Sequence, residues 1–390
     1  MRKFAIFITL IMVFSASCFA EEATTEVGTG DYFLFGKYQN EDILWRCADI
    51  DDNGVLLISD EILCYKAFDA PGSVLTGSHG RGTGRTNNGS NYWADSNIRA
   101  WLNSNAAAGN VIWPCGNAPS IENFGDSERA YNNEKGFLNE FTEEEISLIK
   151  NVTQKSILDQ NEYENMTSYG QAAHIKNASI ENVVQNYDTA YGEQVTDKIF
   201  LPDVKQIHEM NVNLPNYYKI TSGSTAERCY WLRTARATLN NSTNVRYIDA
   251  TGSVQWRTAE DAIGIRPAFY ISESAVINTG DGTKENPFTL IAPYILACKN
   301  LPVYTGTNSS GFAVAVIRNS QGVILTVDMM NIQLSSTATT PVTFIVENTD
   351  FTDGDLLDIY AWDGNMKPVI NAEHYEFSVE DGEIALVSAS

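Results

Sequence analysis

Two pairs of neighbouring residues, each with at least one aromatic ring, could contact a ligand directly. Tyr92 and Trp93 follow a segment rich in Gly and Asn, and Trp256 and Arg257 border a second polar stretch. A ring beside a loop has less reason to be buried, and its face can stack on a sugar or another planar group. The alternative is that these rings belong to the hydrophobic core. We take these four residues as candidate ligand contacts.

Three arginines lie inside otherwise apolar runs. Arg99 follows an apolar helix position, Arg233 stands in the run WLRT at 231–234, and Arg266 stands in GIRPAF at 264–269. A guanidinium stays charged at ordinary pH, so an inward-facing arginine needs a carboxylate or several carbonyls as partners. The three could form an anion-binding trio. We favour the other interpretation, in which each is a structural arginine paired within its own domain.

The pattern Asp49-x-Asp51-x-Asn53-Gly54 matches the beginning of a calcium loop, where alternate oxygens surround the ion. The twelfth position is Asp60 instead of Glu, and residues 55–59 are typical of a strand. A tight hairpin turn is therefore the favoured interpretation. We expect no cofactor or metal, with calcium as the alternative.

Catalytic signatures are scarce. The sequence contains no Gly-x-Ser-x-Gly or His-Glu-x-x-His motif, and its four histidines lie in unrelated settings. A glycosidase needs two carboxylates opposed across a cleft, and the 49 acidic residues make chance proximity unavoidable. Binding is therefore the favoured activity, with an enzyme as the alternative.

Local signals predict the elements that position these residues. A β-meander covers residues 31–59, with Asn53 and Gly54 at a turn. Asp95 or Ser96, Thr142 and Asp203 can each cap a helix that begins at the next residues. Residues 244–256 read as a hairpin that turns near Gly252.

Several motifs occur in the order typical of one family. These are WR at 45–46, SNIRAWLN at 96–103, FLPD at 200–203, WLRT at 231–234 and GIRPA at 264–268. Over residues 28–290 the chain resembles the bacterial domain of unknown function 6273, a family with no established activity. Its pattern is similar to the C-type lectin-like fold, including the formylglycine-generating-enzyme branch, although the segment at 200–203 lacks the arginine usual there.

The resemblance implies a fold class and a ligand face. It implies an α+β domain with a mixed, mostly antiparallel sheet and two or more helices. In lectin-like domains the ligand face lies in the loops that join the last strands, which here are residues 235–244 and 257–262. The ligand candidates in these loops are Arg236, Asn240, Asn241, Asn244 and Arg257.

The two ends of the chain predict export and a second domain. Arg2 and Lys3 precede an apolar run too short to span a bilayer, and Ala20 is a suitable cleavage position. Lipoprotein processing at Cys18 is the alternative. From residue 295 onward, short strand-like runs without helices resemble an immunoglobulin-like or fibronectin-like sandwich. We therefore predict a signal peptide (1–20), a lectin-like domain (28–292) and a β-sandwich (295–390).

The amino-acid composition limits the kinds of molecule that this protein could bind. The formal net charge of −23 disfavours nucleic acid and anionic membrane surfaces, and no later segment is long and apolar enough to span a membrane. Five of the six cysteines lie after residue 20, and this odd, sparse set allows at most two disulfides. We expect a secreted or cell-surface adhesion protein that binds a glycan or an extracellular protein. The alternatives are an extracellular hydrolase or formylglycine-generating-type oxidoreductase, and a structural envelope component.

Overall fold

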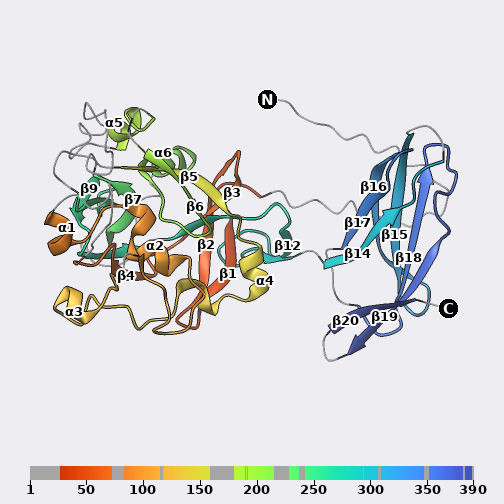
Figure 1. The fold of residues 1–390 in the computed structure, drawn as a ribbon, viewed down its shortest axis with the longest axis horizontal. Helices are drawn as coiled ribbons and strands as arrows, with labels where there is room; N and C mark the ends of the chain where they lie inside the picture. Colours follow the sequence, from red (N-terminus) through yellow and green to blue (C-terminus); the bar gives the residue numbers. More distant parts are fainter. Residues whose placement is uncertain are drawn as a thin grey trace.

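The computed structural model describes residues 27–72, 83–114, 117–158, 180–188, 190, 192–214, 228–236, 242–292, 294–305, 309–346, 351–380 and 383–388. Within these ranges the chain is mostly β, with several antiparallel sheets and short helices. Figure 1 shows the strands from β1 to β13 in one body and those from β14 to β20 in another.

The predicted meander forms the first sheet, which has the order β1-β2-β3-β11. Its turn between β2 and β3 pairs Asp51 with Gly54, whose φ of 113° favours glycine. The hairpin interpretation of this segment is thus confirmed. The strands are β1 (Tyr32–Tyr38), β2 (Glu41–Asp51), β3 (Gly54–Ser59) and β11 (Ala268–Tyr270).

A second sheet of five strands, with the order β4-β10-β7-β8-β9, carries the predicted ligand residues Asn244, Trp256 and Arg257. Arg236 directly follows its strand β7. All of its pairings are antiparallel except a parallel bridge between β10 and β7. The hairpin expected at 244–256 is present as β8 and β9. The strands are β4 (Cys64–Ala67), β7 (Tyr230–Ala235), β8 (Asn244–Ile248), β9 (Val254–Thr258) and β10 (Ala262–Ile265).

Helices and a short ribbon surround these sheets. Thr142 and Asp203 cap their helices as predicted, each within a capping box, and Ser96 caps its helix through its side chain. Two further pairs of strands are β5 (Val152–Ile157) with β6 (Gly192–Asp197), and β12 (Val276–Thr279) with β13 (Thr289–Ile291). The helices are α1 (Thr83–Asn88), η2 (Trp93–Asp95), α2 (Asn97–Leu102), α3 (Ile121–Phe124), η4 (Phe137–Glu140), α4 (Glu143–Ser147), α5 (Ile180–Gln185) and α6 (Val204–Asn213).

The remaining strands build a separate hydrophobic core. One core contains buried residues between Phe33 and Phe288, and the other contains buried residues between Leu301 and Phe377. The second core lies among β14 (Tyr294–Leu301), β15 (Ser309–Arg318), β16 (Ile324–Leu334), β17 (Thr340–Val346), β18 (Leu356–Asp363), β19 (Glu373–Glu380) and β20 (Glu383–Ser388). These form a five-stranded sheet, β16-β15-β18-β19-β20, and the pair β14-β17.

Candidate functional site

The hairpin of β8 and β9 positions a cluster of two arginines and a tryptophan. Arg246 lies directly across from Trp256 in the antiparallel register, so both side chains leave the same face of the sheet. Arg236 follows β7, and its guanidinium carbon lies 3.8 Å from the centroid of the Trp256 ring. At the other end, Asp249 accepts hydrogen bonds from the backbone of Thr251 and Ser253, which fixes the turn.

The two arginines of this cluster are buried, and no described carboxylate forms an ion pair with either of them. Arg236 is 4% exposed and Arg246 is 1% exposed. In the described part of the chain, no hydrogen-bond partner meets Nε, Nη1 or Nη2 of Arg246, or Nε of Arg236. Buried guanidinium groups are ordinarily hydrogen-bonded, because burial removes their hydrogen bonds to water and a group without partners gains none in exchange. The cluster is therefore a concentrated, uncompensated positive charge.

The electrostatics follow from this geometry. Burial lowers the pKa of Arg236. Burial and, secondly, the charge of Arg236 lower the pKa of Arg246 to about 9. Sequence reasoning missed Arg246, although the signal was the one already applied to Arg233 and Arg266: an arginine inside an apolar strand.

The other predicted ligand residues do not all join this cluster. Asn244 is buried, and its carbonyl accepts hydrogen bonds from the backbone of Arg236 at 2.8 Å and the side chain of Asn91 at 3.1 Å. Arg257 is exposed but lies across from Val245, on the face opposite Trp256. Asn240 and Asn241 lie outside the described residues.

Tyr92 and Trp93 are buried, contrary to the surface position expected for them. Trp93 is 1% exposed, and its Nε1 donates to Asp197 at 2.9 Å. The Tyr92 hydroxyl donates to Glu193 at 3.0 Å. Both acceptors belong to β6, which lies about a hundred residues further along the chain. Strand β6 thus accepts hydrogen bonds from the polar atoms of both rings. The local sequence had predicted that these rings lie beside an exposed loop.

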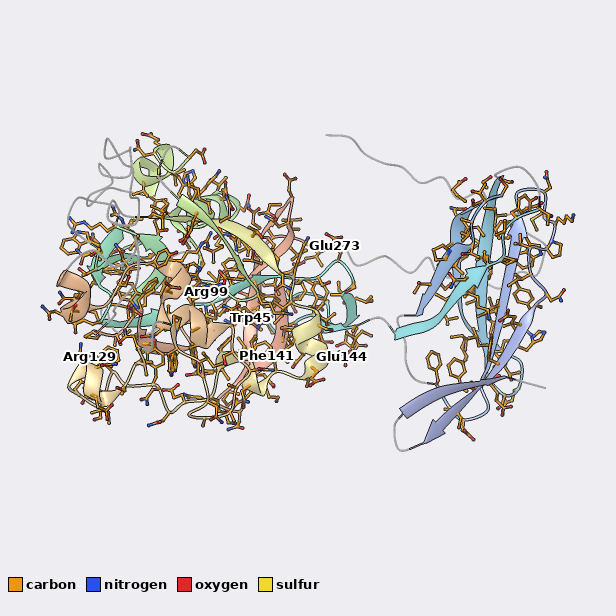
Figure 2. All side chains as sticks on the ribbon, viewed as in Figure 1. Trp45, Arg99, Arg129, Phe141, Glu144 and Glu273 are labelled. Carbon is orange, nitrogen blue, oxygen red and sulfur yellow. The ribbon has the colours of Figure 1, made fainter. Side chains whose placement is uncertain are left out.

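The three arginines interpreted as structural all have partners within the chain. Arg99, which is labelled in Figure 2, contacts Asp197 at 2.5 Å and donates to the carbonyls of Ala94 and Thr196. Arg266 is buried and donates to the carbonyls of Ser59 and Asp60. Neither side chain is therefore arranged as a free anion receptor.

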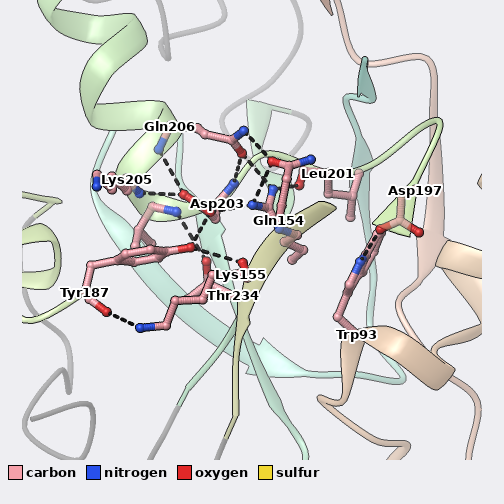
Figure 3. Close-up of polar contacts among 12 residues, drawn as sticks. Trp93, Gln154, Lys155, Tyr187, Asp197, Leu201, Asp203, Lys205, Gln206 and Thr234 are labelled. Carbon is pink, nitrogen blue, oxygen red and sulfur yellow. Dashed lines mark hydrogen bonds and ion pairs between the residues drawn. The ribbon is translucent and has the colours of Figure 1, made fainter. Parts of the chain in front are cut away.

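Arg233 is held most completely. It forms an ion pair with Asp203 at 2.5 Å and donates to the carbonyl of Leu201 and to both Gln154 and Gln206. Figure 3 shows Lys205, Gln206 and Tyr187 around Asp203. Asp203 also accepts from the backbone of Lys205 and Gln206, so one carboxylate caps α6 and anchors β7 at once.

A cavity of about 710 Å³ lies beside this network. Its lining includes Asp49, Asp51, Glu209 and Arg233. Burial raises the pKa of Glu209, and the nearby carboxylates Asp203, Asp49 and Asp51 raise it further. Carboxyl groups with raised pKa in a cavity are candidates for acid catalysis. Sequence alone did not reveal Glu209, because its neighbours come from β2 and from the start of α6.

The calcium-like segment has other hydrogen-bond partners. Asp51 accepts from the Tyr270 hydroxyl and from the backbone of Asn53, and Asp49 accepts from the Asn213 side chain. Across the described ranges, no group of three or more His, Cys, Asp or Glu side chains gathers in a way that could hold a metal ion. Cys47 and Cys64 carry free thiols. None of the described helices has the length and apolar character needed to cross a membrane.

A family model described as Domain of unknown function (DUF6273) matches residues 52–273, more than half of the 390-residue chain. The chain belongs to this family. The resemblance inferred from the separated motifs is thereby confirmed. No curated protein and no solved structure matches the chain. The site in this DUF6273 protein must accordingly be interpreted from its own geometry.

The Arg233–Asp203 pair gives a first prediction. Arg233→Met removes one partner and leaves the Asp203 carboxylate buried, so we expect the free energy of unfolding to fall by about 3 kcal/mol. Arg257→Met is the matched control, because Arg257 is exposed, and it should change stability by less than about 0.5 kcal/mol. Urea denaturation measures both. Equal, small effects would contradict a structural role for Arg233.

Glu209 gives a second prediction. Because its pKa is raised in the folded protein, the folded state favours the protonated carboxyl, and stability is lost as the pH rises through that raised pKa. Glu209→Gln keeps the group neutral. The variant should therefore be more stable than the parent at pH 7, and the difference should shrink at pH 4.

The measurement is denaturant unfolding at both pH values, with exposed Glu128→Gln as the control. A Glu209→Gln effect that does not depend on pH would show that the carboxyl titrates alike in the folded and unfolded states.

Proposed function

We propose that this DUF6273 protein is a secreted or cell-surface bacterial binding protein, non-catalytic, that recognises glycan or extracellular protein ligands. The observation that carries the proposal is the stacking of Arg236 on Trp256 at 3.8 Å. Trp256 is partly exposed, so the cluster reaches the surface at the end of the second sheet. A ring and guanidinium groups at such an edge suit recognition of polar ligands.

The proposal includes a finer fold and a domain organisation. The body with β1–β13 is interpreted as a C-type lectin-like domain (28–292), in which the loops after β7 and β9 form the ligand face. The strands from β14 onward are interpreted as an immunoglobulin-like module (295–390) that displays it. Two separate hydrophobic cores support this division. The basic and apolar beginning of the sequence supports export through a signal peptide (1–20).

Binding can be measured on a glycan array and on immobilised extracellular-matrix proteins. We expect the parent protein to bind at least one of these surfaces and Trp256→Ala to lose most of that binding. Trp362→Ala is the matched control, because Trp362 is a partly exposed tryptophan in β18 that packs on Tyr360. Equal binding by both variants would rule out the Trp256 cluster as the ligand site.

One observation favours a second candidate function, that of a carbohydrate-active hydrolase. Glu209 has a raised pKa and lines the same cavity as Asp49 and Asp51. An acid that stays protonated opposite an ionised carboxylate is the arrangement glycoside hydrolysis requires. Release of reducing sugar from soluble polysaccharides by the parent, and its loss in Glu209→Gln, would support this candidate. Cleavage without binding on either surface would replace the binding proposal.

A further inference from the structure

We propose that the ligand carries an oxyanion on a sugar ring, a uronic-acid carboxylate or a sugar sulfate, and that Arg246 and Arg236 receive it. This inference rests on the proposed function and specifies the ligand class of the same site. Its basis is a contrast between two buried arginines, Arg246 in β8 and Arg266 between β10 and β11. Arg246 and Arg266 are each 1% exposed, yet only Arg266 has carbonyl partners among the described residues.

The N–H donors of the two arginines determine which chemical group the ligand must present. Arg246 offers three nitrogens without hydrogen-bond partners in the described part of the chain, and Arg236 offers one. A guanidinium presents its N–H groups as a planar fork that matches two oxygens of a carboxylate or sulfate. The mutual repulsion of two adjacent guanidinium groups is relieved by an anion between them. A neutral hydroxyl would satisfy hydrogen bonds but not the charge.

The rest of the molecule limits how much negative charge the ligand can carry. The formal net charge of −23 repels a dense polyanion at long range, whereas a single acidic sugar contributes one charge. An acidic sugar within an otherwise neutral glycan therefore fits better than a polyanionic chain or an acidic peptide. The depressed pKa of Arg246 agrees with a cation that has no counter-charge before the ligand binds.

Access to Arg246 involves the side chain across from it. Arg246 is buried, but Trp256, its cross-strand neighbour, is partly exposed and carries Arg236 on its ring. We therefore expect the anion to reach the Arg246 nitrogens by displacing the stacked side chains of Trp256 and Arg236.

The test compares ligands of one ring type in the full protein. Melting temperature and isothermal titration calorimetry are measured with glucuronate, glucose 6-sulfate and glucose, at equal ionic strength set with chloride. We expect one or both anionic sugars to raise the melting temperature and glucose to leave it unchanged. The two anionic sugars distinguish a carboxylate from a sulfate ligand. No response to either anion, or tighter binding of the peptide Glu-Glu, would overturn the proposal.

Two matched variants separate an unpaired arginine from a paired one. Arg246→Met removes a buried charge that has no partner, so we expect a higher melting temperature than the parent and at least about thirtyfold weaker binding of the anionic sugar. Arg266→Met removes a paired charge, so we expect a lower melting temperature and retained binding. A lower melting temperature or failure to fold in Arg246→Met would show that the chain itself pairs Arg246, and would overturn the inference.

The inference and the proposed function can fail separately. Anion binding that depends on Arg246, with no binding to glycan or matrix surfaces, would leave the anion site standing and remove the proposed function. Binding to neutral glycans that is lost in Trp256→Ala but kept in Arg246→Met would support the proposed function and contradict the proposal of an anionic ligand.

Discussion

A buried guanidinium needs hydrogen bonds and a counter-charge, and the body formed by β1–β13 depends on how its arginines obtain them. Arg233 is met by a carboxylate, two amides and a carbonyl, and Arg266 is met by carbonyls. These contacts join segments that lie far apart in the sequence. Arg246 is the exception among these three, since its nitrogens have no such partners in the described ranges.

The paired arginines also determine where the unpaired one lies. Asp203 caps α6 and holds Arg233, so the end of β7 is anchored to that helix and to β5. Arg236 lies three residues after Arg233 in the sequence. The hairpin of β8 and β9 brings Arg246 and Trp256 beside Arg236. A hydrogen-bonded network around Arg233 therefore lies next to a cluster whose guanidinium nitrogens lack partners among the described residues. This is the arrangement expected of a binding site whose last partner comes from outside.

Sequence reasoning succeeded where the interaction is local. The caps at Thr142 and Asp203 and the turn at Gly252 depend on residues a few positions apart, and the structure contains all three. It did not predict the burial of Trp93, because the hydrogen-bond partner of its Nε1 is Asp197 in β6, about a hundred residues further along the chain. It also missed Arg246, since the lack of a partner is a property of all the strands around a residue and cannot be read from the strand that carries it.

The most direct measurement is a crystal structure of the protein grown with the anionic sugar that gives the larger thermal shift. We expect a carboxylate or sulfate whose oxygens lie about 2.8 Å from the nitrogens of Arg246, with the Arg236 and Trp256 side chains displaced from their stacked positions. A structure in which an aspartate or glutamate of the chain itself occupies that place, with the sugar absent or bound elsewhere, would contradict it.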